Sequence, residues 1–146
     1  MAQSHRAVCE TWFRRVWWEQ DETAIDEMLL PESRAEGLSD PDGPAMVGPE
    51  AFKIFHRSLL ALIDRVEVII ERMVSEGECV SLLIHVRATC RRTGKPVEMR
   101  GHVMLRIVDG RLVEGHNHID FIALFEQLDL MPADTLSTCL SGRKIA

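Results

Sequence analysis

The sequence contains no tyrosine, although five phenylalanines and three tryptophans occur among its 146 residues. Any mechanism that needs a phenol hydroxyl as an acid or oxyanion donor is therefore excluded. Positive charge is also scarce, because 17 lysines and arginines stand against 23 aspartates and glutamates and leave a formal net charge of -6. We expect no nucleic-acid partner, since a phosphate backbone favours clustered cations. No apolar run approaches the roughly 18 residues of a membrane span, so we expect no membrane partner either.

Cysteines are few and scattered, which argues against a disulfide framework or a paired-thiolate zinc site. The four are Cys9, Cys79, Cys90 and Cys139. Reduced thiols and the lack of a signal-peptide pattern predict a cytoplasmic protein. The composition, with 46% hydrophobic and 27% charged residues, is that of an ordinary globular domain. We expect one domain over residues 1–131 and a poorly ordered tail over residues 132–146.

The first half of the chain has helical periodicity. Apolar residues recur at three- to five-residue steps between Val8 and Trp17, a second helix ends at Pro31, and a third begins near Pro49. Residues 31–48 contain three prolines and three glycines. This composition predicts a long irregular loop, of the kind that often forms a lid or a binding segment.

The second half alternates between apolar and polar residues from Val66 onward, as strands do. Four strands are expected, with a hairpin turn at Asp109-Gly110 and a short helix after Asp120. Helices followed by a long antiparallel meander indicate an α+β fold. One face of a curved sheet would be covered by the three helices, which leaves a cone with an open mouth.

Candidate catalytic residues concentrate near the end of the last strand. Alternation places His116, His118 and Asp120 on one face of it. A two-residue turn at Asp109-Gly110 would direct this face toward the core, whereas a three-residue loop with a bulge would direct it to solvent. The hydrophobic pattern favours the second register, although functional sites are where such patterns are expected to fail.

Six short motifs follow one another at spacings that cover most of the chain from about Trp12 to Met131. They lie at residues 17–21, 28–32, 48–52, 76–80, 108–114 and 117–128. Their order resembles that of the SnoaL-like polyketide cyclase family, within the nuclear transport factor 2-like fold superfamily. The resemblance implies a cone-shaped barrel in which a curved antiparallel sheet wraps around three N-terminal helices.

The resemblance also implies an activity, the intramolecular aldol closure of a polyketide-like or other small carbonyl compound without a cofactor. It assigns Asp120 as the general acid/base and favours the inward register. His116 and His118, on the same face, would donate to the developing oxyanion or relay the proton. A small hydrophobic molecule would occupy an internal pocket. The residues expected to line it are Phe13, Trp17, Phe55, Met99, Val103 and Asn117.

Two alternatives use the same residues. In the first, His116, His118 and Asp120 bind zinc or ferrous iron, because donors at alternate positions of one strand can converge on an ion. In the second, the protein binds a hydrophobic molecule without altering it. The missing tyrosine argues against a ketosteroid-isomerase-like reaction. By analogy we expect a homodimer, since an open sheet face can accept a partner.

Overall fold

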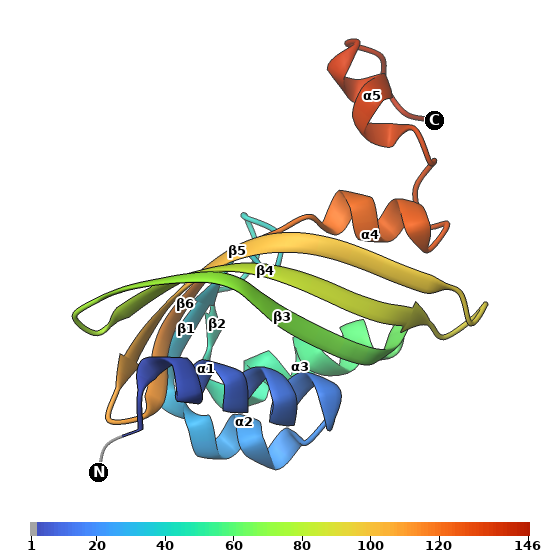
Figure 1. The fold of residues 1–146 in the computed structure, drawn as a ribbon. Coiled ribbons are helices and arrows are strands. Elements are labelled where there is room, and N and C mark those ends of the chain that lie inside the picture. Colours follow the sequence, from blue (N-terminus) through green and yellow to red (C-terminus); the bar gives the residue numbers. More distant parts are fainter. Residues whose placement is uncertain (1–2) are drawn as a thin grey trace.

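The computed structural model describes residues 3–146, which fold into helices and a six-stranded mixed sheet (Figure 1). The helical elements are α1 (His5–Trp12), the π-helix η1 (Phe13–Trp18), α2 (Glu22–Met28), α3 (Gly48–Leu60), α4 (Phe121–Gln127) and α5 (Thr135–Leu140). The strands are β1 (Leu29–Glu36), β2 (Met46–Val47), β3 (Ile63–Glu76), β4 (Cys79–Cys90), β5 (Pro96–Val108) and β6 (Arg111–Ile119). This arrangement confirms the predicted α+β class with a sheet curved around helices.

Local capping explains where the first helices begin. The Ser4 hydroxyl accepts a hydrogen bond from the backbone N–H of Ala7 at 3.1 Å, and the Asp21 carboxylate accepts one from Thr23 at 2.9 Å. Both bonds satisfy backbone donors that have no partner within the helix. Pro49 lies in the first turn of α3, where its missing N–H costs nothing.

The strand order is β2-β1-β6-β5-β4-β3, and the sheet is open. Every pair is antiparallel except β1 and β6, which run parallel, so the prediction of a purely antiparallel sheet is wrong at this point. The segment predicted as an irregular loop in fact contains β1 and β2. Pro31, the proline of β1, lies where the pairing of β1 with β6 shifts register between Leu29 and Arg34. A strand tolerates proline at such an irregularity, because no ladder hydrogen bond is lost there.

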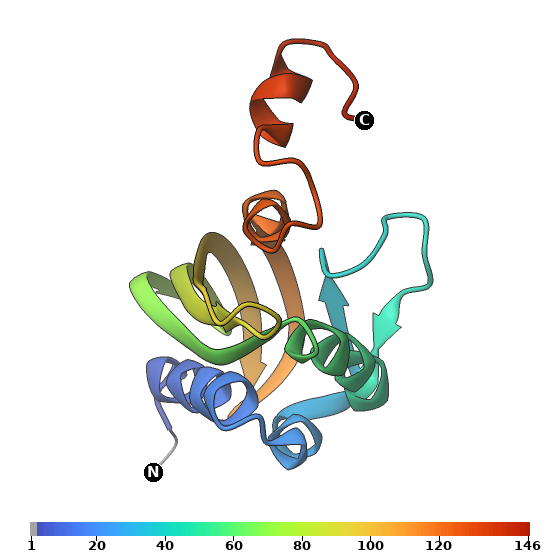
Figure 2. The ribbon, with the colours of Figure 1, turned by 90° about the vertical axis from the view of Figure 1, so that its right-hand side faces the viewer.

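The helices α1, η1 and α3 lie against the concave face of the sheet (Figures 1 and 2). Alternate residues of β4 are buried on this face, as the sequence pattern predicts; Leu82 is fully buried and Ile84 is 3% exposed. Val8, Val16 and Ile25 enter the same core from the helices and are also fully buried. These residues form the hydrophobic core between the helices and the sheet.

The chain ends outside the cone. The side chain of Gln127 links α4 to β5, because its amide accepts from the backbone N–H of Glu98 and donates to the Glu98 carbonyl, at 2.9 and 2.7 Å. Beyond it the structure has the short helix α5 where the sequence predicts a poorly ordered tail, and Figure 2 shows α5 projecting away from the sheet. Thr135, the first residue of α5, is 2% exposed, and its hydroxyl donates to the Pro132 carbonyl in the turn that precedes the helix. Over residues 3–146, no helix combines the length and the apolar character needed to cross a membrane.

Candidate functional site

The register of the last hairpin decides which side chains face the inside of the cone. The turn has two residues, Asp109 and Gly110, both at positive φ (50° and 74°), as a tight hairpin requires. The pairing then slips: Ile107 opposes Leu112, but Arg106 opposes Glu114. One extra residue in β6 therefore forms a β-bulge, which reverses the faces of everything beyond it.

Beyond the bulge, the two candidate histidines lie on the outer face of the sheet. His116 opposes Met104 and His118 opposes His102, and both partners are exposed. The ring Nε2 of His116 lies 2.8 Å from a carboxylate oxygen of Glu114, in a pair whose side chains are each 39% exposed. The structure thus has the outward register that the hydrophobic pattern favoured, and not the inward one.

Asp120 is exposed and caps α4, since its carboxylate accepts a hydrogen bond from the backbone N–H of Ala123 at 3.0 Å. It is not among the residues that line the pocket described next. Its proposed role as an acid/base group stays a prediction. Within residues 3–146, no three His, Cys, Asp or Glu side chains are grouped so as to hold a metal ion. His116, His118 and Asp120 therefore do not form a converging donor set.

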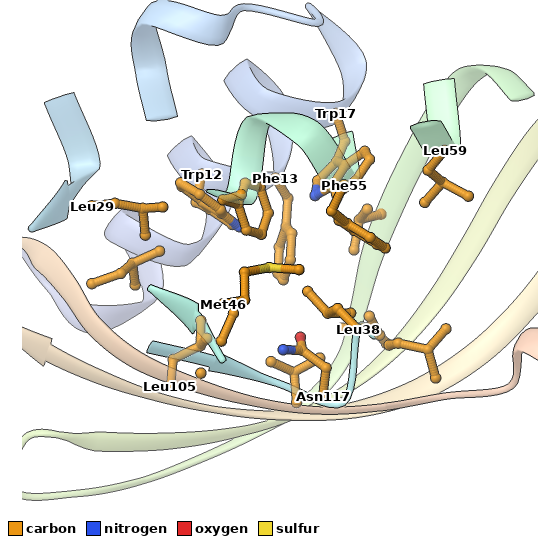
Figure 3. Close-up of a pocket in the computed structure, with 18 of the residues that line it drawn as sticks. Trp12, Phe13, Trp17, Leu29, Leu38, Met46, Phe55, Leu59, Leu105 and Asn117 are labelled. Carbon is orange, nitrogen blue, oxygen red and sulfur yellow. The ribbon is translucent and has the colours of Figure 1, made fainter. Parts of the chain in front are cut away.

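A pocket lies between the helices and the concave face of the sheet (Figure 3). The cavity has a volume of about 100 Å³, and its walls are mainly apolar. The structure places all six predicted lining residues on its walls, namely Phe13, Trp17, Phe55, Met99, Val103 and Asn117. Apolar walls of this kind are typical of a small-molecule site.

Aromatic rings hold the helical wall of the pocket together. Phe55 is in edge contact with Trp17 at 6.1 Å and with Phe121 at 6.5 Å, measured between ring centroids. Trp12 packs against Phe52 at 5.2 Å. Such tilted and edge-on pairs are favourable beyond the area they bury, so they fix the ring positions before any ligand arrives.

Residues 31–48, expected as a loop of the kind that often forms a lid or a binding segment, also contribute to the wall, although none of them was among the predicted lining residues. Leu38 and Met46 project into the pocket (Figure 3), and the segment between them leaves and rejoins the body at two glycines. Gly37 has a φ of 86°, and a Cβ there would lie 1.9 Å from the carbonyl oxygen of Asn117. Gly48 has a φ of 81°. Only glycine allows both conformations without strain, and the two glycines flanking a proline-rich stretch were the available sequence signal.

Few polar groups face this apolar space. Ser33, on the inward side of β1, is 4% exposed. The Asn117 amide nitrogen donates to the Glu36 carbonyl at 2.9 Å. Among the lining residues of the described chain, Arg34 and Glu114 alone carry charge. The carboxylate of Glu114 is bound to a histidine and is 39% exposed. A ligand in the interior would therefore meet mainly hydrocarbon and a small number of neutral polar groups.

A buried histidine supports the helical wall from behind. His56, 1% exposed, donates from Nε2 to the carbonyl oxygen of Val16 at 2.7 Å, while its Nδ1 has no partner among the described residues. The π-helical turn changes which carbonyls the backbone uses as acceptors. The N–H of Glu19 donates to Arg14 and that of Asp21 donates to Arg15, so neither reaches the Val16 carbonyl that His56 binds. Burial lowers the pKa of His56 below its usual value of 6.5, since the charged ring would lose its hydration.

The model of the SnoaL-like domain matches residues 9–115, which is most of the chain, and the protein belongs to this family. A search of the curated proteins gives no match.

Three solved structures share the fold. A candidate SnoaL-like polyketide cyclase from Jannaschia sp. CCS1 is 20% identical, with a TM-score of 0.73 over 90% of this chain and 99% of the other. IdmH, a candidate polyketide cyclase from Streptomyces antibioticus, is 20% identical with a TM-score of 0.72 over 87% and 99%. A Catenulispora acidiphila protein with a ketosteroid isomerase-like fold, solved with trimethylamine, is 16% identical with a TM-score of 0.74 over 90% and 98%. At these identities the likeness concerns the fold.

Proposed function

We propose that this protein binds a small, largely apolar molecule in the pocket between the helices and the concave face of the sheet. The observation that supports this best is the wall itself, in which buried rings such as Trp12 and Trp17 line a mainly apolar cavity. Binding would remove apolar surface of the ligand and of the pocket from water, which stabilises the complex by about 25 cal/mol per Å² of surface buried.

A titration with naphthalene followed by calorimetry tests this proposal. The matched variant is Gly115→Val. Gly115 and Leu105 both line the pocket, and a Cβ at the buried Gly115 would lie only 3.2 Å from the Leu105 side chain, so valine would crowd Leu105 and narrow the pocket. We expect saturable binding to the wild type and at least tenfold weaker binding to the variant. Equal affinity for both, with the fold intact, would contradict binding in this pocket.

A second candidate function is the cyclase or isomerase activity suggested by the names of the structural neighbours. In that reaction a base removes a proton from carbon next to a carbonyl, the enolate attacks a second carbonyl, and the resulting alkoxide takes up a proton. Asp120 is the predicted base. It precedes Phe121, a residue of the pocket wall, by one position.

Hydrogen–deuterium exchange of 2-tetralone, an activated ketone, measures enolate formation directly by NMR. Catalysis through Asp120 predicts faster exchange with the wild type than with Asp120→Asn. Exchange at the uncatalysed rate with both proteins would leave only the binding function.

A homodimer and a cytoplasmic location also stay predictions. The outer face of the sheet exposes Leu83 and Met104, which are 43% and 39% exposed and would form the dimer contact. Sedimentation of the wild type and of Leu83→Asp tests the dimer, which the charge would dissociate. A wild type that sediments as a monomer would refute it.

A further inference from the structure

One neutral polar side chain, Asn117, is fixed in the pocket with a known orientation. It lies on the inward side of β6, opposite Val103. Its Nδ2 donates to the carbonyl oxygen of Glu36 at 2.9 Å. A carbonyl can only accept, so this bond determines which end of the amide carries the nitrogen. Figure 3 shows the amide oxygen of Asn117 turned toward the pocket.

The backbone around Asn117 leaves the amide little freedom. A Cβ at Gly37 would lie 1.9 Å from the Asn117 carbonyl oxygen, so the residue that follows β1 is in close contact with the backbone near the end of β6. A Cβ at Gly115 would lie 3.7 Å from Nδ2. Asn117 Oδ1 accepts no hydrogen bond within residues 3–146. The pocket thus presents an oriented acceptor whose partner must come from a ligand or from water.

The charges around the pocket favour a neutral ligand. Its two charged lining residues are Arg34, which is exposed, and Glu114, whose carboxylate is bound to His116. The rest of the wall is apolar, so an ionised group held there would lose its hydration, and only an anion close to the exposed Arg34 would gain a partner of opposite charge. A single hydroxyl or N–H group, in contrast, would find Oδ1 of Asn117.

We propose that Asn117 Oδ1 accepts a hydrogen bond from the ligand, so that the pocket selects neutral, mostly apolar molecules with one hydroxyl or N–H donor. Simple phenols and fused-ring alcohols belong to this class. The proposal rests on the proposed binding function and adds its specificity. It makes Asn117 a ligand-binding residue, with Glu36 and Gly37 as the positions that hold it.

Calorimetry with three neutral probes of one ring system tests the proposal: naphthalene, 2-methoxynaphthalene and 2-naphthol. Only 2-naphthol can donate a hydrogen bond. We expect it to bind the wild type roughly three- to tenfold more tightly than 2-methoxynaphthalene, as one neutral hydrogen bond would give. Equal affinities would overturn the proposal and leave the binding function standing. If no probe binds, the binding function itself is contradicted.

Two variants identify the acceptor. Asn117→Ala removes Oδ1 and is expected to abolish the preference for 2-naphthol, with naphthalene binding showing that the pocket persists. Leu38→Ala, on the same wall, is the matched control: it should weaken all three probes to a similar extent and keep the preference. A preference that survives in Asn117→Ala would overturn the assignment. If that variant does not fold, the wild-type comparison still decides.

The anion 2-naphthoate tests the selection for neutral ligands. We expect it to bind at least tenfold more weakly than 2-naphthol at pH 7.5, where its carboxylate is ionised. Binding of the carboxylate as tight as that of the phenol would refute this part of the proposal.

Discussion

Replacing His56 with glutamine should remove a specific part of the protein's sensitivity to acid. The native ring is buried and bound through Nε2 to the Val16 carbonyl, and burial lowers its pKa. In the unfolded chain the same ring takes up a proton below its ordinary pKa of about 6.5. Protons therefore bind preferentially to the unfolded state, and stability is lost as the pH falls through 6.5.

The magnitude follows from this linkage. Between pH 7.5 and pH 5.5 the free energy of unfolding should fall by at most about 1.4 kcal/mol through His56 alone. Glutamine can donate from Nε2 to the same carbonyl but does not titrate. The free energy of unfolding of His56→Gln should therefore fall by up to about 1.4 kcal/mol less than that of the wild type between the two pH values. His56→Ala leaves a buried carbonyl without its donor and should cost about 2–4 kcal/mol at either pH.

Urea unfolding followed by tryptophan fluorescence, at pH 7.5 and 5.5, measures these differences. Wild type and His56→Gln are compared by their change between the two pH values, so that other titrating groups cancel. Equal losses in both proteins would refute the claim that a neutral His56 joins α3 to the π-helix.

Three further predictions concern backbone, cap and dimer. Gly37→Ala should lower the free energy of unfolding by roughly 2 kcal/mol or more, because its Cβ would collide with the Asn117 carbonyl. The control Gly77→Ala, where φ is also positive but no atom lies nearby, should lower it by about 1 kcal/mol. Equal losses of stability in urea unfolding would contradict the close contact at Gly37. Asp120→Ala should destabilise the protein by about 1 kcal/mol and Asp120→Asn by much less, because asparagine can still cap the helix. Both variants should bind naphthalene as the wild type does. A changed affinity would place Asp120 at the pocket. Leu83→Asp should convert a sedimenting dimer to monomer.

Much of the fold follows from the sequence because strand alternation and helix periodicity are strong local signals. The inward residues of β4 and the turn at Asp109-Gly110 are examples. β1 was not predicted, because Pro31 and Gly37 are typical of loops. Its pairing with β6 depends on a contact between segments about 80 residues apart, which no local pattern encodes.

The register of β6 shows why the site was harder to predict than the fold. A single bulged residue near Val113 inverts the faces of His116 and His118, and the turn signal at Asp109-Gly110 is compatible with a hairpin that has such a bulge or lacks it. The hydrophobic pattern was the better guide here, since it favoured Ile119 and Phe121 as inward residues, and both line the pocket. The family resemblance predicted the fold and the pocket but favoured the opposite register.

The three tryptophans allow the most direct test of the central claim, which is that a small apolar molecule binds inside the cone. Trp12 and Trp17 line the pocket, whereas Trp18 lies outside it and is 49% exposed. Their indole N–H signals can be followed separately by ¹⁵N–¹H NMR during a titration with naphthalene. We predict saturable shifts of the Trp12 and Trp17 signals and no shift of the Trp18 signal. Shifts confined to Trp18, or no saturable shift of any indole, would contradict the account.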